Sequence, residues 1–132
     1  MERIKERLSV ARTALHALKE AVGRNDLNQL ERDGAIQRFE FTYETVWKAV
    51  QAYLDGFEKI KIASPRGIVR ASFDAGLIDE EQAQALLRMS DDRNSTVHTY
   101  DEKFAKELYG RLKGHAELMD FWLNAVSSRL EK

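Results

Sequence analysis

The sequence predicts an all-α protein, an antiparallel up-and-down bundle of four to five helices that forms a single domain over residues 1–132. Apolar residues recur in alternating steps of three and four along three long stretches, which is the spacing of one face of an α-helix. The chain contains one proline and seven glycines, so few residues interrupt helical structure. Alternation of apolar and polar residues is nowhere long enough for a strand.

The first helix is predicted over residues 2–22, with an apolar face made by Ile4, Leu8, Ala11, Leu15, Leu18 and Val22. The polar stretch 23–26 ends it, because glycine and asparagine favour helix C-termini. A short turn is expected over residues 27–31. The second helix is then predicted from about residue 33 to residue 57, and its apolar face holds Phe39, Tyr43, Val46, Val50, Tyr53 and Phe57.

Two shorter helices are predicted in the middle of the chain. Ser64 and Pro65 indicate the start of the first, since serine caps a helix and proline is favoured at the first helical position. This helix is expected to stop at Gly76. The acidic run 79–81 indicates the start of the next helix, because carboxylates are favoured at the positive end of the helix dipole.

The last helix is predicted over residues 101–130, and its apolar face holds Phe104, Leu108, Leu112, His115, Met119, Trp122 and Val126. The segment 99–102 fits a capping box, in which the Thr99 hydroxyl caps the helix and the Glu102 carboxylate reaches back to the capping residue. The sequence therefore predicts a break in the chain just before this helix.

Composition narrows the possible functions. Hydrophobic residues make up 43% of the chain and charged residues 33%, a balance typical of soluble globular domains. The chain has no cysteine, which excludes disulfides and thiolate metal sites. The net charge of −1 excludes a protein that binds nucleic acid through a broadly basic surface, so any RNA contact must come from a local cluster. No signal core or membrane span is visible, and we expect a cytoplasmic protein.

The most informative segment carries the pattern R-x-x-x-x-H-x-Y, formed by Arg93, His98 and Tyr100. Arginine supplies a permanent planar cation that suits phosphate. Histidine has an unperturbed pKa near neutrality, so it can donate or accept a proton there. Tyrosine offers a phenolic oxygen that can be hydrogen-bonded or modified. These are the groups needed to cleave a phosphodiester without a metal or a cofactor.

The geometry of the pattern requires a bend. On a straight helix, residues five apart point roughly 140° away from each other, at about 100° per residue. Arg93 and His98 converge only if the chain turns between them, and the polar run 94–96 favours such a turn. With twelve arginines and three histidines in the chain, this spacing is also an ordinary coincidence, and a solvated histidine is the competing interpretation.

Two neighbours of the pattern are candidate supporting residues. Asn94 is expected to orient His98 or to donate a hydrogen bond to phosphate. Asp92 is expected to pair with Arg93. Tyr100 is either an exposed part of the site or a buried core tyrosine.

Glu44 lies on the second predicted helix and has two interpretations. It either belongs to a solvated face or anchors Arg93 or Arg38 near the site. Arg66 and Arg70, one helical turn apart, either extend a phosphate path or are solvated.

The remaining histidines are not expected to bind a metal. His115 lies on the apolar face of the last helix and is expected to be a packed core residue. His16 is expected at the surface. Neither is expected to have the acidic or histidine neighbours that a metal site needs.

Segment 93–101 resembles the signature of HEPN domains, in particular of the HepT branch, in which a polar residue follows the arginine as Asn94 does here. Further blocks resemble the same group, which also carries the name nucleotidyltransferase substrate-binding protein. They are Ile36 to Glu44 with Trp47-Lys48, Ser64-Pro65-Arg66, Gly76-Leu77-Ile78 and His98 to Glu102. The blocks cover about residues 30–105. The chain departs from the pattern at 82–85, where an aromatic residue often occurs.

The resemblance implies a HEPN-like bundle that forms a homodimer or higher oligomer, with two motifs facing each other. It implies an RNase toxin whose partner is a minimal, MntA-like nucleotidyltransferase that transfers AMP from ATP to Tyr100 and silences the toxin. On this interpretation Arg93 binds the scissile phosphate and His98 serves as general acid or base. One histidine cannot easily do both, and a dimer would supply two. AMP on Tyr100 would place a bulky anion beside Arg93 and repel RNA.

Two other functions stay open at this point. The chain is alternatively a non-catalytic substrate-binding subunit of a nucleotidyltransferase, with Arg93 and His98 binding a nucleotide. The near-neutral charge of the chain is compatible with this interpretation. A plain helical dimerisation module is the third possibility, and the sequence blocks argue against it.

Overall fold

The computed structural model describes residues 1–131, and every regular element in that range is helical. In chain order the elements are α1 (Glu2–Ala21), α2 (Gln29–Tyr53), η1 (Leu54–Glu58), α3 (Pro65–Asp74), α4 (Glu80–Asn94), η2 (Ser95–His98) and α5 (Glu102–Leu130). The all-helical fold class predicted from the sequence is confirmed.

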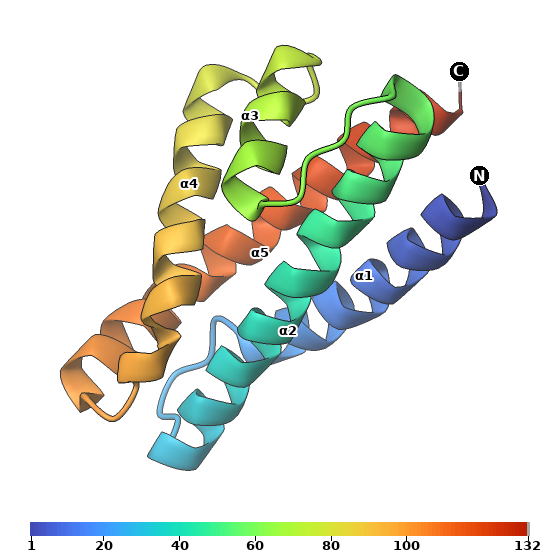
Figure 1. Cartoon of the computed structure of the whole chain (residues 1–132). Helices are drawn as coiled ribbons and strands as arrows, with labels where there is room; N and C mark the ends of the chain where they lie inside the picture. Colours follow the sequence, from blue (N-terminus) through green and yellow to red (C-terminus); the bar gives the residue numbers. More distant parts are fainter. Residues whose placement is uncertain (132) are drawn as a thin grey trace.

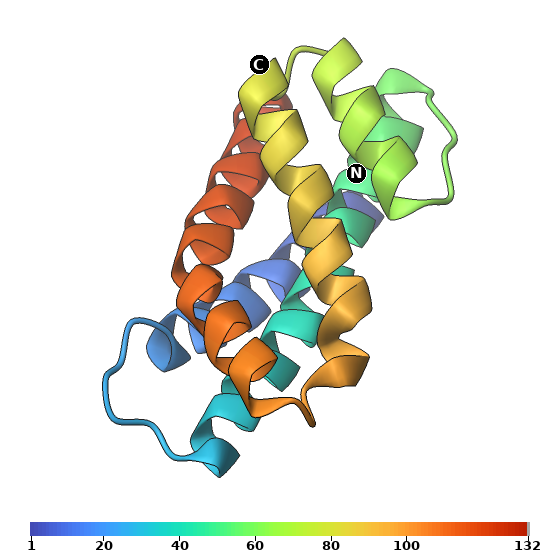
Figure 2. The same cartoon turned by 90° about the vertical axis from the view of Figure 1, so that its left-hand side faces the viewer.

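The helices pack as an up-and-down bundle in which both chain ends lie at the same end of the molecule (Figure 1). α1 packs mainly on α2, and α2 also packs on α5. α3 and α4 form an antiparallel hairpin, and α4 then runs down to the junction with α5 (Figure 2). None of the helices in residues 1–131 combines the length and the apolar character that a membrane span requires.

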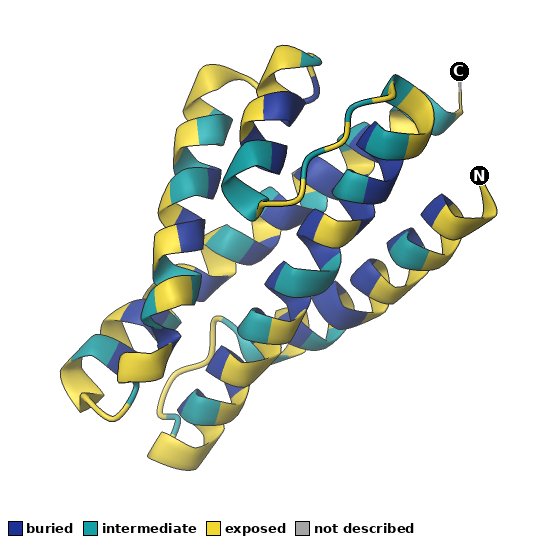
Figure 3. Ribbon diagram, viewed as in Figure 1, coloured by how far each residue is buried: buried dark blue, intermediate teal, exposed yellow. Residues whose placement is uncertain are grey.

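The core forms where the predicted apolar faces meet. Buried positions lie on the sides of the helices that face one another, and exposed positions lie on the outside (Figure 3). Trp122 of α5 is fully buried, and its indole Nε1 donates a 3.1 Å hydrogen bond to Ser72 Oγ of α3. A buried indole N–H needs such a partner, so this bond fixes α3 against α5.

Phe57 departs from the predicted apolar face of the second helix, since 44% of it is exposed. The last turn changes from α-helix to the π-helix η1, and Leu54 is buried instead. A turn of π-helix contains more residues than a turn of α-helix. Apolar residues spaced for an α-helix, with 3.6 residues per turn, therefore no longer fall on one face beyond it. Lys59, in the left-handed conformation with φ of 62°, then ends the helix.

The predicted starts of the two middle helices are confirmed. The Ser64 side chain accepts a hydrogen bond from the Gly67 amide at 3.1 Å, and Pro65 is the first residue of α3. Asp79 caps α4 in a reciprocal arrangement with Gln82. α3 ends at Asp74, shortly before the predicted stop.

The second helix begins earlier than predicted, so the turn expected over residues 27–31 is mostly wrong. Asn28 accepts from the Glu31 amide at 2.8 Å, and the Glu31 carboxylate accepts from the Asn28 amide at 3.0 Å. This capping box starts α2 at Gln29. The first three residues of α2 are exposed, Leu30 by 81%, so the apolar periodicity there was too weak to indicate a helix.

The predicted cap of the last helix is also wrong. Thr99 has the helical angles φ −67° and ψ −10°, because it continues the turn that follows η2. A capping residue needs extended backbone, which occurs at Asp101 with ψ of 106°. Asp101 Oδ1 accepts from the amides of Lys103 and Phe104 at 3.1 and 3.3 Å. The Glu102 carboxylate does not reach back but pairs with Arg32 of α2 at 3.2 Å.

Candidate functional site

The R-x-x-x-x-H-x-Y segment lies at the junction between α4 and α5, where the chain turns. α4 ends at Asn94, and a single 3₁₀ turn, η2, carries the chain to His98. The buried Thr96 hydroxyl donates to the Arg93 carbonyl at 2.8 Å. This hydrogen bond from the side chain to a carbonyl of the last turn of α4 stabilises the turn. The predicted break between the arginine and the histidine is confirmed.

His98 and Tyr100 lie together on the surface beyond this turn. The Tyr100 hydroxyl is 3.5 Å from His98 Nδ1, at the outer limit of a hydrogen bond. Their rings meet edge to face with centroids 5.9 Å apart. Tyr100 is 81% exposed, so the alternative of a buried core tyrosine is wrong. Both the imidazole and the phenol are open to an incoming molecule.

Arg93 points from the last turn of α4 toward α2. Its Nε lies 3.7 Å from the Glu44 carboxylate, close enough for an ion pair but too long for a hydrogen bond. The Nε atom is buried and makes no hydrogen bond within the described residues. Glu44 is thus an ion-pair neighbour of Arg93 that is also partly exposed, and its supporting role in the site stays a prediction. Arg38 instead donates to the Ala17 carbonyl at 2.8 Å.

The expected pairing of Asp92 with Arg93 is wrong. Asp92 faces α5, where it accepts two 2.9 Å hydrogen bonds from Arg111 and lies 2.7 Å from His115 Nε2. Burial alone would raise the pKa of Asp92. The hydrogen bonds and charges of His115 and Arg111 outweigh that effect and lower its pKa to about 2. The same hydrogen bonds raise the pKa of Arg111.

His115 is packed as expected, but it has an acidic neighbour that the sequence did not reveal. Its ring stacks on Phe39 with centroids 5.4 Å apart, and its Nε2 contacts Asp92. The two residues are 23 positions apart on different helices, so no local pattern could join them. Within residues 1–131, no three histidine, aspartate or glutamate side chains are grouped as metal ligands would be.

The other candidate residues lie around this junction. Asn94 is exposed, and its side chain makes no hydrogen bond in the described part of the chain, so its two predicted roles stay predictions. Arg66 pairs with Asp91 of α4 at 3.0 Å, whereas Arg70 is exposed. Arg66 is therefore held against α4 on the side of Tyr43, where Arg93 also lies.

Tyr43 is a buried neighbour of both arginines. Burial raises the pKa of its phenol, while the hydrogen bond with Ser90 and the positive charges of Arg66 and Arg93 oppose that rise. Both arginines therefore lie near enough to the buried phenol of Tyr43 to act on its pKa electrostatically. Arginine suits phosphate and histidine suits proton transfer, so the residues around this junction include both kinds of group. Across residues 1–131, no hydrogen bond or ion pair joins Arg93 to His98 directly.

A family model and a named relative both match this chain. The family model described as "Nucleotidyltransferase substrate binding protein like" matches residues 6–128. The chain is 31% identical over 100 residues to a protein of Haemophilus influenzae named "Probable ribonuclease HepT", a match that covers 73% of this chain and 67% of that protein.

Solved structures share the fold. A protein of Thermus thermophilus is 46% identical, with a TM-score of 0.85 over 88% of this chain and 98% of that one. The tri-AMPylated Shewanella oneidensis HEPN toxin, solved in complex with the MNT antitoxin, has a TM-score of 0.77 over 95% of this chain and 96% of that one. At 15% identity the latter similarity shows the fold alone. The chain belongs to the nucleotidyltransferase substrate-binding-protein-like family, the HepT group of HEPN-domain proteins.

Proposed function

We propose that the chain is a metal-independent endoribonuclease toxin of the HepT kind, silenced when a minimal nucleotidyltransferase attaches AMP to Tyr100. The observation that carries this proposal is the placement of one half-buried guanidinium and one exposed imidazole–phenol pair on either side of a single 3₁₀ turn. The name of the Haemophilus influenzae relative supports the nuclease part, and the AMP-bearing Shewanella oneidensis toxin supports the modification.

Arg93 is suited to hold the scissile phosphate. Its guanidinium is partly buried, so its orientation is restricted, and Glu44 at 3.7 Å satisfies it only weakly. A phosphate oxygen would form the charge-assisted hydrogen bonds that Glu44 does not. The same contacts would stabilise the charge that builds up on the phosphorus oxygens in the transition state.

His98 is placed for proton transfer. As base, an imidazole takes the proton of the ribose 2′-hydroxyl, and the 2′-oxygen then attacks phosphorus while the bond to the 5′-oxygen breaks. The leaving 5′-oxygen needs a proton from an acid, and the products are a 2′,3′-cyclic phosphate and a 5′-hydroxyl. A second copy of the chain would provide the second imidazole, so the proposal includes a homodimer or higher oligomer with motifs facing each other.

Tyr100 is accessible to a nucleotidyltransferase. Its phenolic oxygen would attack the α-phosphorus of ATP, release pyrophosphate and lose its proton to solvent. The new phosphodiester would lie next to His98, which is 3.5 Å from the phenolic oxygen. An added negative charge and the bulk of AMP would compete with RNA for this surface.

An RNA cleavage assay in EDTA tests the nuclease. We expect the unmodified protein to cleave single-stranded RNA to products ending in a cyclic phosphate, and Arg93→Ala and His98→Ala each to lower the rate by a factor of about a hundred or more. Circular dichroism checks that each variant is folded. Cleavage that persists in both folded variants would contradict the proposed roles.

Mass spectrometry tests the modification. After incubation with the partner nucleotidyltransferase and ATP, we expect AMP on Tyr100 and loss of cleavage. Tyr100→Phe should remain active and unmodified at this position. Full silencing of the Tyr100→Phe protein would show that modification of this residue is not the cause.

A second candidate function follows from the family description itself, which names substrate binding. In this alternative the chain is a non-catalytic substrate-binding subunit of a nucleotidyltransferase, and Arg93 and His98 hold a nucleotide. The absence of cleavage by clean, unmodified protein, together with nucleotide binding that disappears in Arg93→Ala, would favour it.

A further inference from the structure

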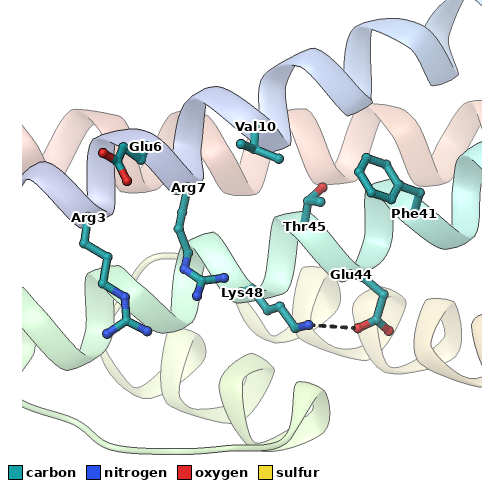
Figure 4. Close-up of a pocket in the computed structure, with 8 residues that line it drawn as sticks. All are labelled: Arg3, Glu6, Arg7, Val10, Phe41, Glu44, Thr45 and Lys48. Carbon is teal, nitrogen blue, oxygen red and sulfur yellow. Dashed lines mark ion pairs between the residues drawn. The ribbon is translucent and has the colours of Figure 1, made fainter.

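A groove of about 490 Å³ runs between α1 and α2 (Figure 4). Its lining residues come in equal numbers from the two helices: Arg3, Glu6, Arg7, Val10, Phe41, Glu44, Thr45 and Lys48. None of the residues assigned above to catalysis or modification lies in it. The groove combines two apolar side chains with three positively charged and two acidic ones, so its charged lining is net positive in a chain whose net charge is −1.

The apolar part of the groove consists of two open side chains. Phe41 is 60% exposed and Val10 is 50% exposed, on facing helices. Phe41 also borders the adjoining groove of about 730 Å³ farther along α1 and α2. An exposed aromatic ring at a groove wall is a platform on which a flat ring can stack, and bases of single-stranded RNA stack on such rings irrespective of sequence.

The positively charged part of the groove consists of Arg3, Arg7 and Lys48. Neither arginine makes a hydrogen bond or an ion pair with another residue of the described chain. Both guanidinium groups extend from α1 toward α2, on the side where Lys48 lies, and the Glu6 carboxylate points the other way (Figure 4). Two cations without an acidic partner are therefore available to an anion.

The groove opens beside Arg93 of the R-x-x-x-x-H-x-Y segment. Glu44 lines the groove, and its carboxylate lies 3.7 Å from Arg93 Nε and 3.9 Å from Lys48 Nζ. A strand whose scissile phosphate lies on Arg93 would therefore pass over Glu44 and reach the groove within a short distance. The Glu44 carboxylate thus lies between Arg93 and Lys48.

We infer that this groove binds a nucleotide of single-stranded RNA that flanks the scissile bond, with its base against Phe41 and its phosphate on Arg7 and Arg3. The inference rests on the proposed nuclease function and extends it to a substrate-binding subsite. Basic side chains beside an aromatic wall match the needs of a single strand, namely stacking for the base and cations for the backbone.

Binding is measured in the His98→Ala protein, so that RNA stays intact, by fluorescence anisotropy with a short labelled single-stranded RNA at several salt concentrations. Phe41→Ala should weaken binding by about fivefold or more, the effect of removing one base stack. Arg7→Gln and Arg3→Gln should each lower the slope of log affinity against log salt by about 0.7 for each phosphate that the side chain no longer neutralises.

Two matched variants serve as controls. Arg88→Gln removes the same charge from an exposed position on α4, and Phe121→Ala removes an aromatic ring that is 47% exposed on α5. Neither residue lines the groove. The inference is overturned if Arg7→Gln and Phe41→Ala change affinity and salt slope no more than these controls do. It is equally overturned if Phe41→Ala changes only the oligomeric state, measured by light scattering, which would assign the groove to a second copy of the chain.

Cleavage kinetics separate this inference from the nuclease proposal. In the parent protein, groove variants should raise KM for a longer strand and leave cleavage of a dinucleotide, which has only the scissile phosphate, unchanged. Groove-dependent RNA binding without any cleavage would reject the nuclease and keep the subsite. Cleavage with normal kinetics in all groove variants would reject the subsite and keep the nuclease.

Discussion

Asp92 and Arg93 are consecutive in sequence but contact different helices of the bundle. Neighbouring residues on a helix point about 100° apart, so they do not share a face. Asp92 therefore reaches α5, where Arg111 and His115 hold it, and Arg93 reaches Glu44 of α2. The paired aspartate holds the last turn of α4 against α5, and this in turn limits how far Arg93 can move.

This network predicts a pH-dependent stability. The pKa of Asp92 is lowered from 3.8 to about 2, so its stabilising effect is complete above pH 3.8 and is lost as the pH falls toward about 2. A shift of this size corresponds to about 2 kcal/mol of unfolding free energy. At neutral pH, urea unfolding should show that Asp92→Asn lowers the free energy of unfolding by this amount. The difference in unfolding free energy between the variant and the parent should shrink in acid.

Asp91→Asn is the matched control for that experiment. Asp91 is the preceding residue and pairs with Arg66 at 3.0 Å, but its side chain is 68% exposed. Exposed ion pairs contribute little, so this variant should unfold nearly as the parent does. If both variants lose the same unfolding free energy, the buried ion pairs of Asp92 stabilise the protein no more than the exposed ion pair of Asp91 does.

At the scale of the elements, the junction between α4 and α5 determines where the site lies. A 3₁₀ turn carries the chain from Arg93 to His98, and the exposed segment before Asp101 presents the imidazole and the phenol. Because the turn ends α4 and a new cap starts α5, the two ends are fixed by different side chains, Thr96 and Asp101.

The cap assignment is testable with two neighbouring substitutions. Asp101→Ala should destabilise the protein by about 1 kcal/mol, since two amides at the start of α5 lose their acceptor. Thr99→Ala should have little effect, because the Thr99 side chain accepts no hydrogen bond from the start of α5. Thermal unfolding followed by circular dichroism measures both. A larger loss in Thr99→Ala than in Asp101→Ala would contradict the cap.

At the scale of the whole molecule, the proposed chemistry needs more than one chain. A single motif presents one imidazole, and cleavage of a phosphodiester requires a base and an acid. If two copies of the chain share one catalytic centre, a protomer with His98→Ala inactivates its partner as well.

Mixing experiments test this sharing. In mixtures of parent and His98→Ala protein that exchange subunits, RNase activity should fall with the square of the parent fraction, so an equal mixture retains about a quarter of the activity. A linear fall, with about half of the activity retained, would show that each protomer works alone. Diluting the parent protein with an inert protein in the same proportions provides the control.

The sequence by itself determined the helices and the order in which they occur. Apolar spacing and local caps such as those of Ser64 and Asp79 act within a few residues, so they are readable along the chain. The pattern of Arg93, His98 and Tyr100 was equally local, and the polar residues between them indicated the turn. Family resemblance then supplied the expected partner and chemistry.

Only the tertiary structure decided how side chains from different helices combine. It assigned Glu44 to Arg93, gave Asp92 to Arg111 and His115, and placed Phe41 opposite Val10 in a groove. These pairs are set by how helices pack and rotate against each other, and many rotations are compatible with the same apolar spacing. The residue at which α5 starts was also decided by the tertiary structure. A helix cap requires extended backbone, and the 3₁₀ turn before α5 leaves Thr99 helical and Asp101 extended.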